Sequence, residues 1–349
     1  NLVYTRNINA PNYGAKLTGR TNDHSVGVFI TDDDSTNILI PGNRSSAVAK
    51  IEGESKAAAI RYRYNYGPDI TLGWISTLRT AKDYENSVHG IDARFQLTTT
   101  DVFKFQSLYS NTEYPEDMFE QFCGSEDSSE CLTPEEEQCE FSECNYNEKV
   151  LRTFNDEPFS GNAFKVGYYY NDENWHYRAN YEKQNAGFRG DLGFIARVDY
   201  HQYSLGGERK WYAEQGNWWS KAELSSSWNK TQNDNNEFIG ERLSVNASLN
   251  AKYGTHLRLG LTHRERVGSR LDDSTLAIDG NTTLFTENQF HLSASIRPIL
   301  GLSLRSNIDY GDTIDYNNNR LGLNKQMRFS VNWNVNKHIE LNAKQVFKH

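Results

Sequence analysis

The stretch AIRYRYNYGPDITLGWISTLR, residues 59–79, alternates between apolar and polar side chains. One set of alternate positions in its first half is apolar and largely aromatic: Ile60, Tyr62, Tyr64 and Tyr66. The other set carries Arg61 and Arg63. Because successive side chains of a strand point to opposite faces, this pattern predicts a β-hairpin that turns at 67–69 and has one apolar and one charged face. The apolar face would meet either a second sheet, as in a soluble sandwich, or membrane lipid.

The same alternation recurs along most of the 349 residues and predicts about sixteen strands, within a range of about 14 to 18. An apolar content of 37% and a mean hydropathy of −0.77 fit strands that have one polar face. No run approaches the ~18 apolar residues of a membrane-spanning helix. Strands of a soluble sandwich are usually shorter, about 5–6 residues. We therefore predict an all-β fold, a transmembrane antiparallel β-barrel in the outer membrane of a Gram-negative bacterium, formed as one domain by residues 1–349.

Connectors between the expected strands alternate in length, which is typical of outer-membrane barrels with short periplasmic turns and long extracellular loops. We expect the short connectors at 21–24, 67–69, 99–101, 173–174, 205–208, 251–255, 298–301 and 336–337. We expect the long connectors at 32–55, 80–86, 112–160, 186–191, 231–235, 269–281 and 313–320. One expected strand includes 194–200, and the last one covers 338–347. If every short turn is periplasmic, this last strand runs outward and leaves the C-terminus outside, whereas bacterial barrels usually return both ends to the periplasm. The pattern therefore does not decide on which side of the membrane the C-terminus lies.

Four segments resemble an uncharacterised family of outer-membrane barrels: NLVYTRNI (1–8), YGAKLTGRTNDHSVGVFITDD (13–33), GWISTLRTAKDYENSVHGIDARFQL (73–97) and NAGFRGDLGFIARVDY (185–200). The resemblance is best over residues 1–200. In that family the barrel often follows a module similar to family-9 carbohydrate-binding domains. The resemblance therefore implies either upstream strands and such a module, or a second chain that completes or plugs the barrel. It implies no catalytic residues.

The face opposite the apolar one is expected to line the lumen, and it is rich in bases. The sixteen bases on it are Arg61, Arg63, Arg79, Arg94, Lys104, Lys165, Arg178, Arg197, Lys221, Arg242, Arg258, Arg264, Arg297, Arg305, Arg328 and Lys344. The six acids are Asp92, Glu182, Asp199, Glu223, Asp309 and Glu340. Sixteen minus six leaves an excess of +10 on this face, although the whole chain has a net charge of −9. An enclosed basic surface concentrates anions.

This excess predicts a porin-like pore or uptake component for anionic or carbohydrate-derived solutes, the carbohydrate part being an analogy with the family's module. One alternative is that the bases only form ion pairs within the lumen, such as Arg178 with Glu182. A second alternative is a non-conducting structural or assembly barrel that holds a partner protein in its lumen or at its rim. Outer-membrane lipid is an expected partner, and the net charge of −9 argues against nucleic acid.

Residues 112–160 form the longest expected loop, which is acidic and extracellular. Its four cysteines predict two disulfides in an oxidising compartment, with three pairings open: Cys123, Cys131, Cys139 and Cys144. Their spacing fits no common zinc site. The loop also carries a candidate Ca²⁺ site at Glu135, Glu136 and Glu137, although a solvated loop, or one that folds over the basic lumen as a gate, would have the same composition. We expect no other cofactor.

Enzymatic motifs are weak in this sequence. The pattern assigns His176, His201 and His291 to the polar face, and it assigns His263 to the apolar face without an identifiable serine partner. The sequence contains no haem-attachment, phosphate-loop or zinc-protease motif. We therefore expect that the chain is not an enzyme.

Overall fold

The structure is a computed structural model that describes residues 2–3, 8, 10–34, 36–42, 46–51, 53–115, 158–267, 284–315 and 320–348. These residues form strands, bridges, turns and bends. The four cysteines and Glu135, Glu136 and Glu137 lie outside the described residues, so the predicted disulfides and Ca²⁺ site stay predictions.

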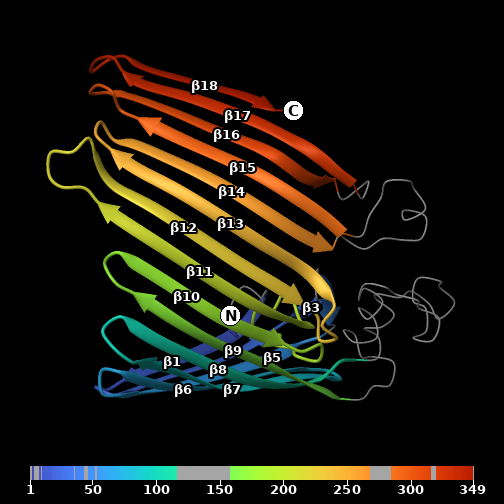
Figure 1. Ribbon diagram of the computed structural model, residues 1–349. Coiled ribbons are helices and arrows are strands. Elements are labelled where there is room, and N and C mark those ends of the chain that lie inside the picture. Colours follow the sequence, from blue (N-terminus) through green and yellow to red (C-terminus); the bar gives the residue numbers. More distant parts are fainter. Residues whose placement is uncertain are drawn as a thin grey trace. The chain divides into compact units, whose positions relative to one another are not determined.

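The described residues form eighteen strands. Figure 1 colours them along the chain from blue at the N-terminus to red at the C-terminus. The strands are β1 (Pro11–Arg20), β2 (His24–Asp33), β3 (Thr36–Pro41), β4 (Ser46–Ile51), β5 (Ser55–Tyr66), β6 (Ile70–Ala81), β7 (Tyr84–Gln96), β8 (Asp101–Glu113), β9 (Phe159–Asn171), β10 (Trp175–Gln184), β11 (Tyr200–Tyr212), β12 (Trp219–Gln232), β13 (Phe238–Ala251), β14 (Thr255–Val267), β15 (Leu284–Ile296), β16 (Leu302–Asp315), β17 (Arg320–Asn334) and β18 (Glu340–Lys348). Sixteen of them form one sheet that runs in chain order from β1 to β18, while β3 and β4 form a separate hairpin. The predicted all-β class, built from antiparallel neighbours, is confirmed.

The opening stretch folds as expected, because β5 and β6 pair across a turn at 67–69. Tyr62 lies opposite Trp74 and Arg63 lies opposite Gly73. Residues opposite each other in an antiparallel pair share a face, so the aromatic and charged faces are separated as the alternation predicts.

The chain divides into two compact units, described separately below. Unit 1 comprises residues 1–168, 180–203 and 231–237. Unit 2 comprises residues 169–179, 204–230 and 238–349.

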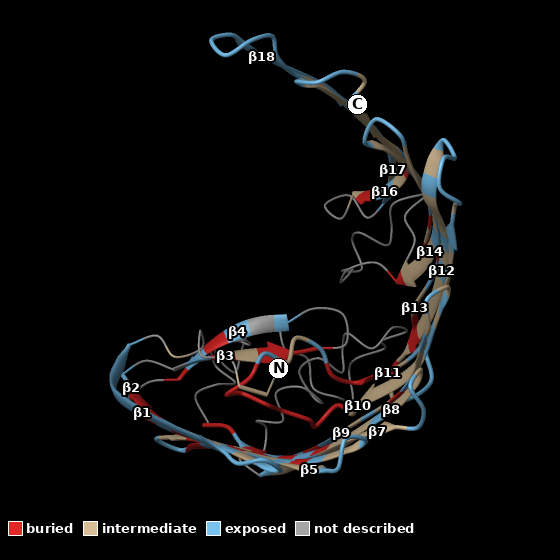
Figure 2. Cartoon of the chain, turned by 90° about the vertical axis from the view of Figure 1, so that its left-hand side faces the viewer, coloured by how far each residue is buried: buried red, intermediate tan, exposed pale blue. Residues whose placement is uncertain are grey.

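In unit 1 the polar face of β6 to β8 is covered by residues 185–199, here called the inner segment. Phe188 and Val198 of this segment are completely buried and pack with Val88 of β7 and Leu108 of β8. The hairpin of β3 and β4, partly buried in Figure 2, contributes a second cluster with Ile38 and Ile40, next to Tyr84 and Tyr114.

The expected strand over 194–200 is wrong, since only Tyr200 belongs to a strand there. The alternation of Phe194, Ala196 and Val198 resembled a strand, but Val198 is buried by packing on the sheet whereas Phe194 is 50% exposed. Glycines allow this close packing. A Cβ atom on Gly187 would lie 2.2 Å from the carbonyl oxygen of Ser160, and one on Gly161 would lie 2.1 Å from the nitrogen of Phe188.

In unit 2 the apolar face of β13 to β18 consists of large exposed side chains. Leu261 of β14 is 60% exposed and Phe347 of β18 is 53% exposed. Other exposed members of this face are Leu243, Leu259, Leu323 and Phe329. Contiguous exposed apolar surface of this kind needs a non-aqueous partner.

Two expected connectors differ from the structure. Residues 205–208 lie inside β11, because Gly206 and Gly207 sit in the strand and do not turn it. The expected long connector 80–86 is a turn at 82–83 between β6 and β7. Within unit 2, β18 pairs antiparallel to β17 and ends at the edge where β13 begins, opposite the turn at 335–339.

Candidate solute-binding surface

The polar face of unit 2 is built from cross-strand rows, since antiparallel register places one polar residue of each strand opposite the next. One row runs from β13 to β17 through Ser248, Arg258, Ser293, Asn307 and Arg328. The adjacent row contains Asn250, His256, Ser295, Arg305 and Ser330. Arginines in these rows are therefore flanked by neutral side chains.

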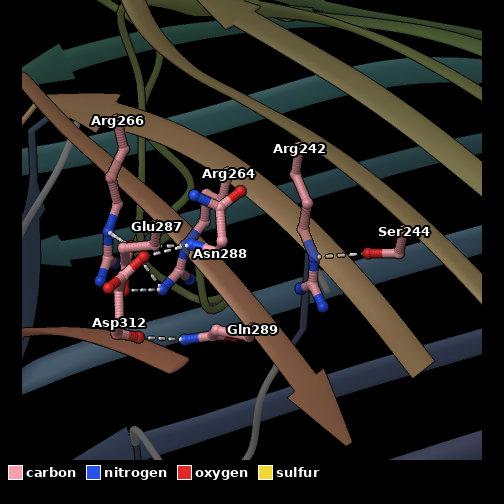
Figure 3. A network of polar contacts seen from close by, with 8 residues as sticks. All are labelled: Arg242, Ser244, Arg264, Arg266, Glu287, Asn288, Gln289 and Asp312. Carbon is pink, nitrogen blue, oxygen red and sulfur yellow. Dashed lines mark hydrogen bonds and ion pairs between the residues drawn. The ribbon is translucent and has the colours of Figure 1, made fainter. Parts of the chain in front are cut away.

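Near the opposite end of the same strands, two arginines bind one carboxylate and a third arginine lies on the neighbouring strand (Figure 3). Glu287, which is 1% exposed, accepts hydrogen bonds from Arg264 Nε at 2.8 Å and Nη2 at 2.7 Å, and from Arg266 Nε at 3.0 Å. Arg242 lies directly opposite Arg264 in the register and donates to Ser244 Oγ at 3.0 Å. We call Arg242, Arg264, Arg266 and Glu287 the arginine cluster.

The arginine track consists of the arginine cluster together with Arg258, Arg305 and Arg328, and it lies entirely on unit 2. Within the described part of the chain, Arg258 and Arg305 form no ion pair, and Arg328 donates to the neutral Gln326 at 2.7 Å. Arg242 and Ser248 are six residues apart on β13, which corresponds to about 20 Å along a strand. Arg242, Arg258, Arg305 and Arg328 therefore place positive charge with no carboxylate partner among the described residues over most of the length of the strands.

Other predicted lumen bases of unit 2 have carboxylate partners or backbone roles. Lys221 pairs with Glu223 at 2.6 Å, and the acid Asp309 accepts from His291 at 2.6 Å. The backbone nitrogen of Arg297, just after β15, donates to Tyr253 O at 2.8 Å. Lys344 of β18 lies opposite Ser330. Ion pairing thus describes part of the polar face, including Arg264 and Arg266 with Glu287, but not Arg242, Arg258, Arg305 and Arg328 of the arginine track.

In unit 1 the predicted bases are mostly engaged. Arg61 donates to Asp92 at 2.8 Å and Lys165 donates to Glu182 at 2.7 Å. Arg197 lies 4.8 Å from the centre of the Tyr200 ring. The remaining bases share the polar face of the sheet by register: Arg63 opposite Gly73, and Arg94 opposite Lys104. Asp199, one of the acids expected on this face, accepts a hydrogen bond from the backbone nitrogen of Asp234 at 3.1 Å.

Arg79 lies on the expected face of β6, but it is 1% exposed because the inner segment covers it. Its guanidinium lies 3.6 Å from Asp33 and donates to Asp191 O at 3.4 Å. Arg189 of the inner segment is also buried and donates to Ala186 O and Phe188 O. These arginines hold the fold of unit 1 together.

Asp191 fastens the inner segment to the sheet. Its carboxylate accepts from Tyr84 Oη at 3.0 Å and from Tyr114 Oη at 3.4 Å, and its nitrogen donates to Asn86 at 3.0 Å. Burial raises the pKa of Asp191 to about 6, against the opposing effect of Arg189. No periodic signal in the sequence pointed to this contact, because it joins residues over a hundred positions apart.

His201 is a correction, since the structure places it with the apolar side chains. Its ring centre is 6.4 Å from that of Tyr181 and 5.8 Å from that of Tyr203. The neighbouring Tyr200 donates to Glu182 on the polar face at 2.6 Å. The expected strand over 194–200 had reversed the assignment of the two faces.

A serine–histidine pair was also missed from the sequence. Ser76 Oγ lies 3.0 Å from His89 Nδ1 on the apolar face, at opposite positions of β6 and β7. The pair lies in the middle of both strands, where ladder pairing engages the backbone N–H groups that could stabilise an oxyanion. We assign it no catalytic role.

Among the residues that the structure describes, no group of three histidine, cysteine or carboxylate side chains could hold a metal ion. The same residues include no helix with the length and apolar character needed to cross a membrane.

Comparisons with known proteins give likeness of fold only. No family model matches the chain, and no curated protein matches it. Solved structures that resemble it include Pseudomonas aeruginosa OccK10 (OpdN), with 11% identity, 96% of this chain and 86% of that chain covered, and a TM-score of 0.42. Pseudomonas aeruginosa OpdQ matches with 11% identity, 96% and 87% coverage, and a TM-score of 0.45. A mutant of the Pseudomonas aeruginosa ferric enterobactin receptor PfeA matches with 10% identity, 95% and 53% coverage, and a TM-score of 0.46.

Proposed function

We propose that the chain forms an outer-membrane β-barrel of a Gram-negative bacterium and conducts anionic or carbohydrate-derived solutes along the arginine track. The observation that carries the proposal is the arrangement of the two faces of β13 to β17. One face exposes leucine, valine and phenylalanine side chains, and the other carries Arg258, Arg305 and Arg328 with neutral side chains opposite them on β13 to β17.

Lipid is the partner that fits the apolar face. The strands in the main sheet are 9 to 15 residues long, the range in which tilted strands cross a bilayer. A polar face opposite to lipid then borders water, as the interior of such barrels does. The two rows on this second face consist of polar side chains, which also argues against burial between two sheets of a soluble sandwich.

Anions are the solutes that fit the polar face. Arginine side chains lining a pore attract anions and repel cations. The unpaired guanidiniums of Arg258 and Arg305 act on a passing solute, because no neighbouring carboxylate cancels their charge in the described residues. A carbohydrate-derived solute would add hydroxyl groups, which the serines and asparagines of the rows can hydrogen-bond.

The test is single-channel recording of the purified full chain in planar bilayers. We expect stepwise conductance with a reversal potential that shows anion preference. The absence of conductance at every applied voltage would refute the proposal that the chain conducts solutes, and it would favour a non-conducting barrel that holds a partner. That second candidate is supported by the inner segment and the β3–β4 hairpin, which cover the polar face of unit 1.

Two predictions from the sequence remain proposals about partners. The resemblance over residues 1–200 supports a second chain, or further strands, that would complete or plug the barrel. Calcium bound by Glu135, Glu136 and Glu137 would be an extracellular structural ion. The mass of co-purifying chains and calcium analysis of the dialysed protein test these two proposals separately.

A further inference from the structure

A cavity of about 540 Å³ lies on unit 2, over the strands β9 to β13. Binding sites for small molecules have volumes of about 300–1,000 Å³. Its polar lining includes His176, Arg178, Gly206, Ser225, Ser227 and Asn246. The cavity is separate from the arginine cluster, but Ser244, which accepts from Arg242, is two positions from Asn246 on β13.

The floor of the cavity is Gly206, and Arg178 lies directly across it. A Cβ atom on Gly206 would be 2.6 Å from Arg178 Nε and 3.0 Å from its Cγ. Any other residue at 206 would therefore push the arginine away from the sheet. Arg178 has no hydrogen bond or ion pair within the described residues, so its N–H groups are available to a ligand.

The rest of the lining is neutral or internally paired. Ser225, Ser227 and Asn246 have no hydrogen-bond partner among the side chains of the described residues, and they offer hydroxyl and amide groups to the cavity. The carboxylate in the lining, Glu208, is paired with Lys210 at 2.9 Å and lies 3.9 Å from His176. The net character is one unpaired guanidinium beside a set of neutral donors and acceptors.

We propose that this cavity binds a sugar acid, with Arg178 pairing its carboxylate and Ser225, Ser227 and Asn246 hydrogen-bonding its hydroxyls. Guanidinium binds carboxylate through two parallel hydrogen bonds. A neutral sugar would leave the arginine unpaired, and a small inorganic anion would leave the serines and the amide unused. The proposal rests on the proposed function for the way in which solute reaches the polar face, and it names the class of solute.

The binding test uses the purified full chain in detergent and isothermal titration calorimetry with D-glucuronate, D-glucose and sulfate. We expect D-glucuronate to bind at least about ten-fold more tightly than either of the other two. R178Q should reduce the D-glucuronate affinity about ten-fold or more, since it removes a charge-assisted bidentate pair. Sulfate binding as tight as D-glucuronate binding would overturn the proposal in favour of a general anion site.

Two glycine substitutions provide a matched pair. G206A places a methyl group under Arg178 and should weaken D-glucuronate binding as R178Q does. G207A adds the same methyl group at the next position, which also borders the cavity, but a Cβ atom there points to the opposite face and would make ordinary contact with the Tyr177 ring at 3.5 Å. G207A should bind D-glucuronate normally. Equal binding by wild type, R178Q and G206A would refute the assignment of the cavity.

The failure of this proposal can be told apart from failure of the conduit. If the chain conducts anions but D-glucuronate neither binds nor blocks the current, the cavity proposal is wrong and the conduit stands. If D-glucuronate binds in an Arg178-dependent way but no conductance occurs, the cavity stands and the conduit is wrong.

Discussion

The double variant R258Q/R305Q should lower anion selectivity, because it removes two charges that no described carboxylate neutralises. A solute about 7 Å from one guanidinium gains or loses about 0.6 kcal/mol in water. Screening at 0.1 M salt, where the Debye length is about 10 Å, halves this to about 0.3 kcal/mol. Since an anion gains and a cation loses this amount, each arginine changes the permeability ratio by about three-fold.

The double variant is therefore expected to lower the anion-to-cation ratio by about seven- to ten-fold at 0.1 M salt, with most of the effect lost at 1 M, where the Debye length is about 3 Å. The assay is the reversal potential across a planar bilayer with a salt gradient. The matched control is K325Q, which removes the same charge from the apolar face, where Lys325 lies 6.0 Å from the Tyr310 ring. An unchanged reversal potential in R258Q/R305Q, or an equal shift in K325Q, would refute the reasoning.

Three further predictions concern pairing and packing. S295D places a carboxylate opposite Arg305, so it should lower anion preference about three-fold at 0.1 M salt although the arginine is retained; S295N, measured in the same bilayer assay, should not. E287Q removes the negative charge and one of the two oxygens that accept from Arg264 and Arg266, so it should destabilise the fold by about 3 kcal/mol. The measurement is urea unfolding in lipid vesicles, and a midpoint equal to wild type would contradict the role of Glu287. Because the folded-state pKa of Asp191, about 6, lies above its ordinary value, its contribution to stability is present at low pH and is lost as the pH rises from about 4 to about 6. The stability difference between wild type and D191N, measured by urea unfolding, should therefore change over that pH interval, and a constant difference would contradict the raised pKa.

The sequence was sufficient for features that repeat every two residues. The hairpin of β5 and β6 follows from the alternation around Tyr62 and Arg63, and the count of about sixteen strands follows from its recurrence. The arginines of β13 to β17 also lie on the face that alternation predicts. In each case the physical cause is local, because the pleat of one strand decides which face a side chain takes.

Contacts between distant parts of the chain were not predictable in this way. Val198 belongs to an alternating apolar pattern, yet it does not continue the sheet, because it is buried together with Phe188 against β7 and β8. Arg79 has the sequence pattern of a lumen residue, but Asp33 and the inner segment enclose it. Gly206 and Gly207 resembled a turn because glycine is common in turns, whereas Gly206 makes room for Arg178.

The same distinction changes how the charge of the polar face should be interpreted. A count of sixteen bases against six acids treats all bases as equal, but their effect on a solute depends on the residue opposite each one. Arg61 lies beside Asp92 and Lys221 beside Glu223, so the fields of these pairs largely cancel beyond a few ångströms. Arg258 and Arg305 each lie between two serines, whose dipoles leave the charge intact. Among the arginines of β13 to β17, anion selectivity should therefore reside in Arg242, Arg258, Arg305 and Arg328, and it should be less sensitive to the bases that pair with a carboxylate.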